Sequence, residues 1–174
     1  MTNHTALPIP PAALKELRDT DDAGRPCAPY TATESGGPLR CCLRPAQAGD
    51  EIALVSYAPL RRWAAETWAK PGAYDEQGPV FIHADPCEGP DADPDDYPFS
   101  RPGALRTLRR YNAEGHIVGG RLLEIPETAA DGFDAALAEA FADPEVALVH
   151  VRAVEYGCFQ FEVRRGAEPR ANTP

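Results

Sequence analysis

Polar side chains alternate along residues 150–162 in a pattern that could support chemistry. The segment reads as two β-strands joined by a tight turn at residues 155–157. If Val154 pairs with Cys158, then Arg152 lies opposite Gln160 and His150 lies opposite Glu162. Both pairs share one face of the hairpin. The other face carries the apolar side chains Val149, Val151, Ala153, Phe159, Phe161 and Val163. A base, a guanidinium, a thiol and a carboxylate on one face predict the floor of a polar site.

A second group of reactive side chains follows the predicted buried strand 79–83. His83 lies at the end of this strand, on the side opposite Ile82, and Cys87 follows four residues later. This spacing is that of half a zinc site. The residues that could complete such a site are Cys42, His150 and Cys158.

Strand geometry argues against zinc held by the final hairpin. His150 lies four residues along the strand from the pair Val154 and Cys158, roughly 13 Å at ~3.3 Å per residue. Zinc bonds are only ~2.0–2.3 Å long, so His150 and Cys158 cannot share one ion. Arg152 between them would also place a cation beside the metal. We therefore expect a site without metal or other cofactor, with structural zinc as an alternative.

Each of these features also has a purely structural interpretation. His150 opposite Glu162 could be a cross-strand ion pair, and Cys42 and Cys158 could be small buried side chains rather than nucleophiles. The acidic residues of segment 85–96 have spacings similar to those of a calcium loop. They lack its central glycine and distal glutamate, and prolines interrupt them, which favours a solvated loop.

The composition excludes several classes of protein. The 174 residues carry a net charge of −10, which disfavours nucleic-acid binding. The cationic residues are 15 Arg and two Lys, a usage typical of GC-rich codons and of a bacterial source. The sequence shows neither a signal segment nor a run of ~20 apolar residues, so we expect a cytoplasmic protein without membrane contact. Five cysteines, two of them adjacent, do not suggest a disulfide framework.

The elements that must position these residues follow from periodicity and turn signals. We expect helices at 12–19, 61–70 and 128–142, the last capped by Thr128 or Asp131. Strands are expected at 51–57, 79–83, 105–111 and 116–125 and in the final hairpin, with loops at 21–38 and 85–101. This order predicts a single α+β domain, with a mainly antiparallel sheet, hairpins and one or two packed helices. Residues 1–34 would form an N-terminal extension, 35–165 the main domain and 166–174 a frayed tail.

The sequence resembles the bacterial domain-of-unknown-function 1203 family over most of residues 35–165. The similar segments are 38–44, 54–57, 78–83 with Cys87, 110–111, 150–152 and 156–159, and the stretch from His150 to Cys158 is the most specific. The family pattern Cys-Arg-x-Cys-Leu has its first cysteine where this chain has Leu39, which argues further against a cysteine–metal site. The segment 61–72 is longer than the family pattern leads us to expect. The resemblance implies a shared site without naming a reaction.

We expect a cofactor-independent enzyme that acts on a small anionic metabolite in a biosynthetic pathway. Imidazole titrates near neutral pH, so His83 or His150 would be the general acid or base. Tyr156 could donate a proton, and Cys158 is a candidate nucleophile.

The remaining predicted site residues would bind the substrate. Arg152 would hold a carboxylate or phosphate through a two-pronged hydrogen bond, in a cavity shared with His83. Further candidates for binding are Tyr57, Trp63, Trp68 and Gln160, with one tryptophan packed inward and the other forming a wall or lid. The partner would be a small molecule, and the protein a monomer or homodimer. One alternative is a non-catalytic ligand-binding or interaction module; another is a zinc-binding protein that uses His83 and Cys87.

Overall fold

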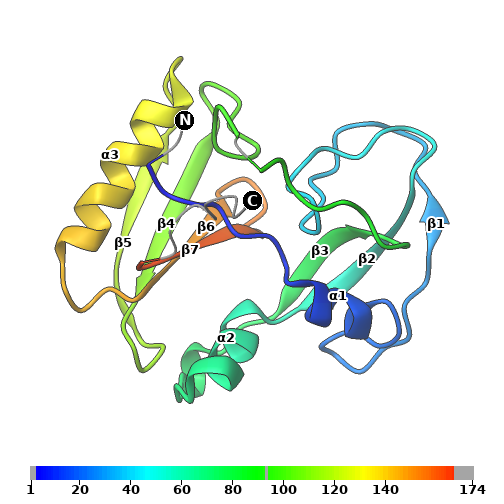
Figure 1. Cartoon of the computed structure of the whole chain (residues 1–174), viewed down its shortest axis with the longest axis horizontal. Coiled ribbons are helices and arrows are strands. Elements are labelled where there is room, and N and C mark those ends of the chain that lie inside the picture. Colours follow the sequence, from blue (N-terminus) through cyan, green and yellow to red (C-terminus); the bar gives the residue numbers. More distant parts are fainter. Residues whose placement is uncertain (1–2, 93, 167–174) are drawn as a thin grey trace, which may run out of the picture. The chain divides into compact units, whose positions relative to one another are not determined.

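The computed structural model describes residues 3–92 and 94–166. The described parts of the chain form two compact units, one within residues 8–90 and the other within residues 1–7 and 91–174 (Figure 1). Each unit contains an antiparallel sheet and at least one helix, so the predicted α+β class is confirmed. The expected frayed tail at 166–174 lies, apart from Gly166, outside the described residues.

The unit formed by residues 8–90 is built on a sheet of three strands in the order β1–β2–β3. These strands are β1 (Tyr30–Thr31), β2 (Glu51–Tyr57) and β3 (Gly78–His83). The helices are α1 (Pro11–Leu17), α2 (Pro59–Thr67) and the 3-10 turn η1 (Gly72–Tyr74). Arg62 of α2 bonds Glu16 of α1 at 2.8 Å and Asp22 at 2.8 Å, which ties the two helices together.

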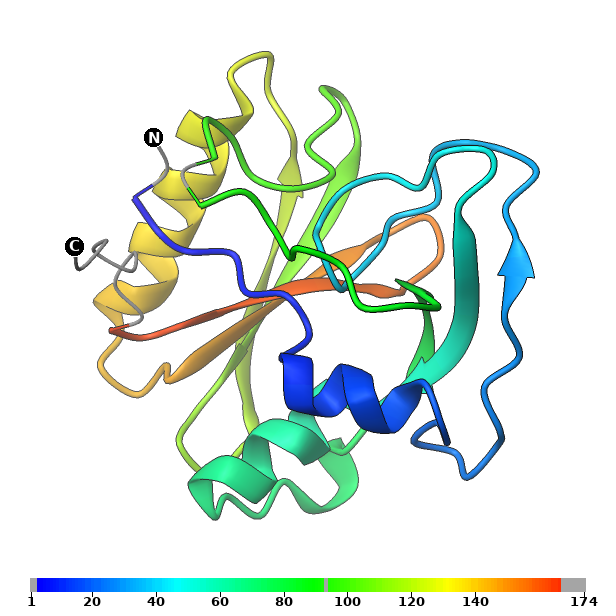
Figure 2. The same ribbon diagram turned by 45° about the vertical axis from the view of Figure 1, so that its right-hand side comes forward.

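The second unit contains a sheet of four strands in the order β5–β4–β6–β7. The strands are β4 (Leu105–Tyr111), β5 (Ile117–Glu124), β6 (Leu148–Ala153) and β7 (Phe159–Arg164). Helix α3 (Ala129–Ala142) lies along one face of this sheet (Figure 2). There Phe133 packs against Phe161 and Tyr97, with ring centroids 6.0 and 4.8 Å away. Aromatic burial of this kind is a major source of core stability.

Most element boundaries lie within two residues of their predicted positions. The predicted strands 51–57 and 105–111 are confirmed at both ends. Helix α2 begins two residues earlier than predicted, because Pro59 suits the first helical turn. It ends at Thr67, three residues early, since Trp68 adopts a left-handed conformation with φ of 62°. Strand β1, of only two residues, was not predicted within the loop 21–38.

The predicted register of the final hairpin is wrong beyond its first half. His150 does pair with Glu162, but a β-bulge follows Val151, and Arg152 pairs with Phe159 instead of Gln160. The strands are joined by residues 154–158, which is longer than the predicted tight turn. Because a bulge inserts one extra residue, it reverses the faces beyond it. Phe159 therefore lies against the ring of His150, with centroids 5.2 Å apart, rather than on the apolar face with Val151.

The start of α3 also differs from its prediction. Thr128 stands at the N-cap position but makes no side-chain capping bond, and Asp131 lies within the first turn of the helix. Gly132, one position later, packs against the ring of Pro126. The absence of a Cβ at Gly132 leaves room for this ring beside the first turn of α3.

Gly132→Ala should lower the free energy of unfolding. An added Cβ would lie 2.6 Å from Cδ of Pro126 and 2.8 Å from its Cγ, and overpacking of this kind costs ~1–3 kcal/mol. Helix propensity alone predicts the opposite sign, since alanine favours a helix by about 1 kcal/mol over glycine. Urea unfolding decides between the two. Gly78→Ala, where a Cβ would meet no atom within 4 Å, is the matched control.

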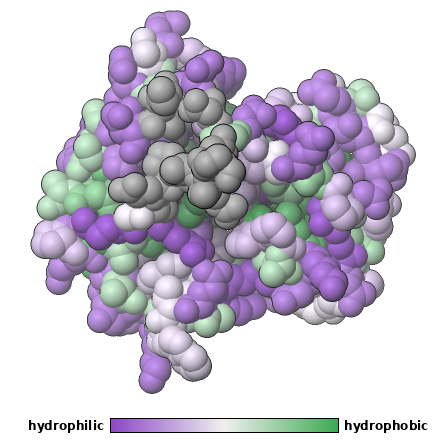
Figure 3. Space-filling model, in the orientation of Figure 1, coloured by the Kyte–Doolittle hydropathy of each residue, from purple (hydrophilic) through white to green (hydrophobic). Residues whose placement is uncertain are grey.

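The face of the surface drawn in Figure 3 is mainly hydrophilic. Apolar residues form smaller areas between the hydrophilic ones. Among the residues that the structure describes, none of the helices combines the length and apolar character needed to span a bilayer.

Candidate metal centre

Two adjacent cysteines occupy a tight turn at residues 39–44, which we call the cysteine turn. The backbone N–H of Leu39 donates to the carbonyl of Arg44 at 3.0 Å, and the N–H of Leu43 donates to the carbonyl of Leu39 at 2.9 Å. Leu43 adopts a φ of 57°, in the left-handed region that a tight reversal requires. The turn is held to β3 by the N–H of Arg40, which donates to the carbonyl of Phe81 at 2.9 Å.

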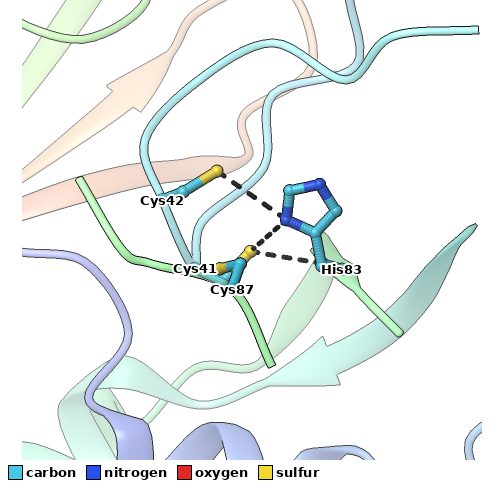
Figure 4. A group of neighbouring side chains, drawn as sticks. All are labelled: Cys41, Cys42, His83 and Cys87. Carbon is cyan, nitrogen blue, oxygen red and sulfur yellow. Dashed lines mark hydrogen bonds between the residues drawn. The ribbon is translucent and has the colours of Figure 1, made fainter. Parts of the chain in front are cut away.

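The cysteine turn places Cys41 and Cys42 beside His83 at the end of β3, and Cys87 reaches the same point from the following loop (Figure 4). One potential ligand atom from each of the four residues lies within 4.8 Å of all the others. Nδ1 of His83 is 3.5 Å from Sγ of Cys41 and 3.9 Å from Sγ of Cys42. Three thiols and an imidazole therefore converge on one small volume.

The spacing of these atoms is close to that of a tetrahedral metal site. Bonds of about 2.3 Å to sulfur and ~2.0–2.1 Å to nitrogen place tetrahedral ligand atoms about 3.6–3.8 Å apart. The two distances from His83 to Cys41 and Cys42 lie on either side of that range. The separations among all four ligand atoms reach up to 4.8 Å, so binding one ion would draw the side chains together by up to about 1 Å.

Local hydrogen bonds prepare one of the thiols to be a thiolate. The hydrogen bond between the two side chains of Cys41 and Cys42 raises the pKa of Cys41, and burial raises it further. The same bond lowers the pKa of Cys42 to about 5, assisted by the backbone N–H of Arg44 and by His83. The N–H of His83 in turn donates to Sγ of Cys41 at 3.2 Å. Since metals bind the thiolate form, the lowered pKa of Cys42 favours ligation by this residue.

The other nitrogen of His83 faces a carboxylate. Nε2 lies 3.6 Å from Oδ2 of Asp50, and the same oxygen accepts the backbone N–H of Gln47 at 2.8 Å. A carboxylate at the second nitrogen of a metal-binding histidine orients the ring and makes it a better ligand. An open hollow of about 420 Å³ lies here; its lining residues are Leu39, Cys42, Arg44, Pro45, Gln47, Asp50 and His83.

The other predicted site residues of this unit are not gathered around His83. In the register of the sheet, His83 pairs with Ile52 and Tyr57 pairs with Gly78, so His83 and Tyr57 lie at opposite ends of the strands. Tyr57 is buried. Trp63 packs inward from α2 as expected for one of the two tryptophans, whereas Trp68 is 88% exposed.

In the second unit, His150 and Glu162 form a buried pair. Nε2 of His150 lies 3.5 Å from Oε2 of Glu162, and Oε1 of the same carboxylate accepts a hydrogen bond of 2.7 Å from Arg164. The rings of Tyr111 and Phe159 flank His150 at 4.8 and 5.2 Å. Burial lowers the pKa of His150 despite the carboxylate. Burial alone would raise the pKa of Glu162, but His150 and Arg164 lower it.

The turn of the final hairpin carries the remaining predicted residues. Arg152 donates to the carbonyl of Gly157 at 3.1 Å, so its guanidinium braces the turn. Tyr156 is 87% exposed, and Cys158 is half-buried and accepts a hydrogen bond of 3.2 Å from the buried Gln160. His83 and Arg152 belong to different units, and their shared cavity stays a prediction.

Sequence reasoning missed Cys41 as a partner of His83. The absence of the family-pattern cysteine at Leu39 argued against a cysteine–metal site, but the adjacent pair Cys41 and Cys42 supplies two sulfur atoms. The signal that could have found the site is a pair of cysteines in a turn together with His83 and Cys87. All five cysteines are free thiols in the described structure.

Comparisons with known proteins give the chain a family. Neither the curated proteins nor the solved structures contain a match. The model of the family described as "Protein of unknown function (DUF1203)" matches residues 36–165. This span covers most of the chain and includes all four residues of the cluster, so the chain belongs to the DUF1203 family.

Proposed function

We propose that this protein binds one zinc ion through Cys41, Cys42, His83 and Cys87. The observation that carries the proposal is the convergence of four ligand atoms within 4.8 Å of one another. The zinc-binding alternative built on His83 and Cys87 therefore gains two further ligands from the cysteine turn. The expectation of a site without metal is untested, and the geometry supports its opposite.

The chemistry of the ligands favours zinc among the common metals. Thiolate sulfur selects soft or borderline ions, and a tetrahedral set of sulfur and nitrogen ligands is typical of zinc. Iron–sulfur clusters use similar residues. A cluster of two irons, however, needs its two ligand pairs further apart than a single ion does. The compact arrangement of Cys41, Cys42, His83 and Cys87 fits a single ion better.

Four protein ligands give such an ion a structural role. A catalytic zinc site has three protein ligands and keeps one position for water or substrate, whereas structural sites are closed. The ion would join the cysteine turn to β3 through His83 and to the loop after β3 through Cys87. This role fits a binding or interaction module. The predicted enzyme acting on an anionic metabolite stays a prediction, with Arg152 as its proposed anchor.

Asp50→Asn should weaken metal binding without removing it. The substitution takes the negative charge from the oxygen that faces Nε2 of His83, and loss of such an outer partner typically costs ~10–100-fold in affinity. Titration with Co(II), a visible substitute for zinc, measures both coordination and affinity. Wild-type protein should show the intense visible bands of tetrahedral cobalt and the near-ultraviolet bands of cobalt–thiolate bonds.

Asp19→Asn is the matched control, because Asp19 is an exposed carboxylate of the same unit. It should bind cobalt with wild-type affinity. Octahedral spectra without thiolate bands in the wild-type protein would contradict the proposed centre. Equal cobalt affinities of the Asp50→Asn and Asp19→Asn variants would show that Asp50 does not support the metal centre.

A further inference from the structure

We propose that the three sulfur atoms of Cys41, Cys42 and Cys87 form a binding face for trivalent arsenic, which displaces zinc from the centre. The inference rests on the geometry of the proposed zinc site, but it assigns no role to His83. It names a second class of ligand, the thiophilic metalloids, for the same cluster.

The coordination preference of arsenic(III) matches the sulfur part of the cluster. Arsenic(III) binds three thiolates in a pyramid, and its lone pair occupies the fourth direction. The sulfur atoms of Cys41, Cys42 and Cys87 lie within 4.8 Å of one another. The fourth member of the cluster, His83, supplies an imidazole that arsenic does not need. The same four residues thus offer zinc four ligands and arsenic three.

The arrangement also favours chelation over binding at one sulfur. Cys41 and Cys42 are adjacent and held by the cysteine turn, so the second As–S bond forms without a large loss of chain freedom. Cys87 and His83 are partly exposed, which gives a small neutral molecule such as arsenous acid a route to the cluster. Cys27 and Cys158 are not members of the cluster.

The reaction is a ligand exchange without oxidation or reduction. Arsenous acid loses three hydroxyl groups as water as three As–O bonds are replaced by three As–S bonds. Each thiol supplies the proton for one water molecule. In the zinc-loaded protein, the three thiolates leave the zinc ion, and solvent supplies the three protons. Arsenic remains trivalent throughout.

The test is a titration of the full-length, metal-free protein with arsenite in a phosphine reductant. Intact-mass spectrometry counts the protons lost per arsenic, and near-ultraviolet absorption reports As–S bonds. Wild-type protein should bind one arsenic with the loss of three protons. Cys87→Ser should weaken binding more than about 100-fold, beyond the ~10–100-fold that loss of an outer partner costs a metal site. Cys27→Ser is the control and should bind like the wild-type protein.

His83→Gln separates this inference from the proposed zinc site. It removes a zinc ligand but leaves the three sulfur atoms, so arsenite affinity should stay at the wild-type level while zinc affinity falls. Equal weakening of arsenite binding in His83→Gln and Cys87→Ser would overturn the three-sulfur face. Loss of arsenite binding in the control variant Cys27→Ser would also overturn it. A wild-type protein that binds arsenite as expected but takes up no zinc would contradict the zinc proposal and leave the arsenic proposal intact.

Discussion

Protein purified without chelator should contain about one zinc ion per chain, and Cys42→Ser should contain almost none. Cys42 is almost fully buried in the cluster and its pKa is lowered, so its loss removes one of the four ligands. Structural zinc contributes ~10–16 kcal/mol of apparent binding free energy in small zinc-binding peptides. Elemental analysis of the purified chains measures the occupancy.

Cys158→Ser is the matched control for this experiment. Cys158 is also a free thiol with a polar neighbour, Gln160, but it does not belong to the cluster. Its variant should keep the wild-type zinc content. A folded wild-type protein that carries no zinc would contradict the proposed function. Removal of zinc by a chelator should also lower the melting temperature, because a ligand that binds only the folded state stabilises it.

Glu162→Ala should lower the free energy of unfolding by about 1–3 kcal/mol, the cost of leaving a buried polar group without its hydrogen-bond partner. The carboxylate is 4% exposed and contacts both His150 and Arg164. Its removal leaves the fully buried His150 without this neighbour, whereas Arg164 can turn to solvent. Chemical denaturation of the two proteins measures the difference.

Glu139→Ala is the control, since Glu139 also contacts two arginines, Arg110 and Arg121, but on the surface. Exposed ion pairs contribute little, so this variant should unfold like the wild-type protein. The double variant His150→Phe with Glu162→Leu should recover much of the lost stability, because apolar side chains often replace a buried pair at little cost. If Glu162→Ala unfolds like Glu139→Ala, the buried pair has no structural role.

The same pair predicts how stability depends on pH. Burial lowers the pKa of His150 from its ordinary value of 6.5, so the unfolded chain binds a proton that the folded protein does not. Unfolding free energy should therefore fall as the pH drops below about 6.5, by up to about 1.4 kcal/mol per pH unit. The lowered pKa of Glu162 adds a second loss below about pH 4.5. In His150→Phe, denaturation at several pH values should show the first loss abolished and the second reduced, because His150 is one of the groups that lower the pKa of Glu162.

Periodicity and turn signals predicted the strands because their causes are local. Apolar residues bounded by glycine and proline place β2 and β3 from the sequence alone. The predicted register of the final hairpin was wrong because the bulge after Val151 depends on packing, and the alternation of apolar and polar residues carries no signal of it. The prediction of Arg152 as an anchor depended on that register, with neutral Gln160 opposite the guanidinium.

Only part of the candidate site could be predicted from the sequence, because its residues come from two distant segments. The spacing of His83 and Cys87 is visible in the sequence, and it suggested half a zinc site. The bridge between Leu39 and Phe81, which brings Cys41 and Cys42 to the end of β3, is a tertiary contact without a local signal. Of the three partners that the sequence suggested, Cys42 belongs to the cluster, whereas His150 and Cys158 do not.

The two halves of the cluster are far apart along the chain, and this has a consequence for folding. Cys42 and His83 are separated by 41 residues, so an ion between them would close a large loop. A covalent cross-link over a loop of that length lowers the conformational entropy of the unfolded chain, which stabilises the folded state by about 4 kcal/mol. A metal that stays bound to both segments would act in the same way. The centre could thus replace a disulfide as a long-range cross-link, and it would form without an oxidant.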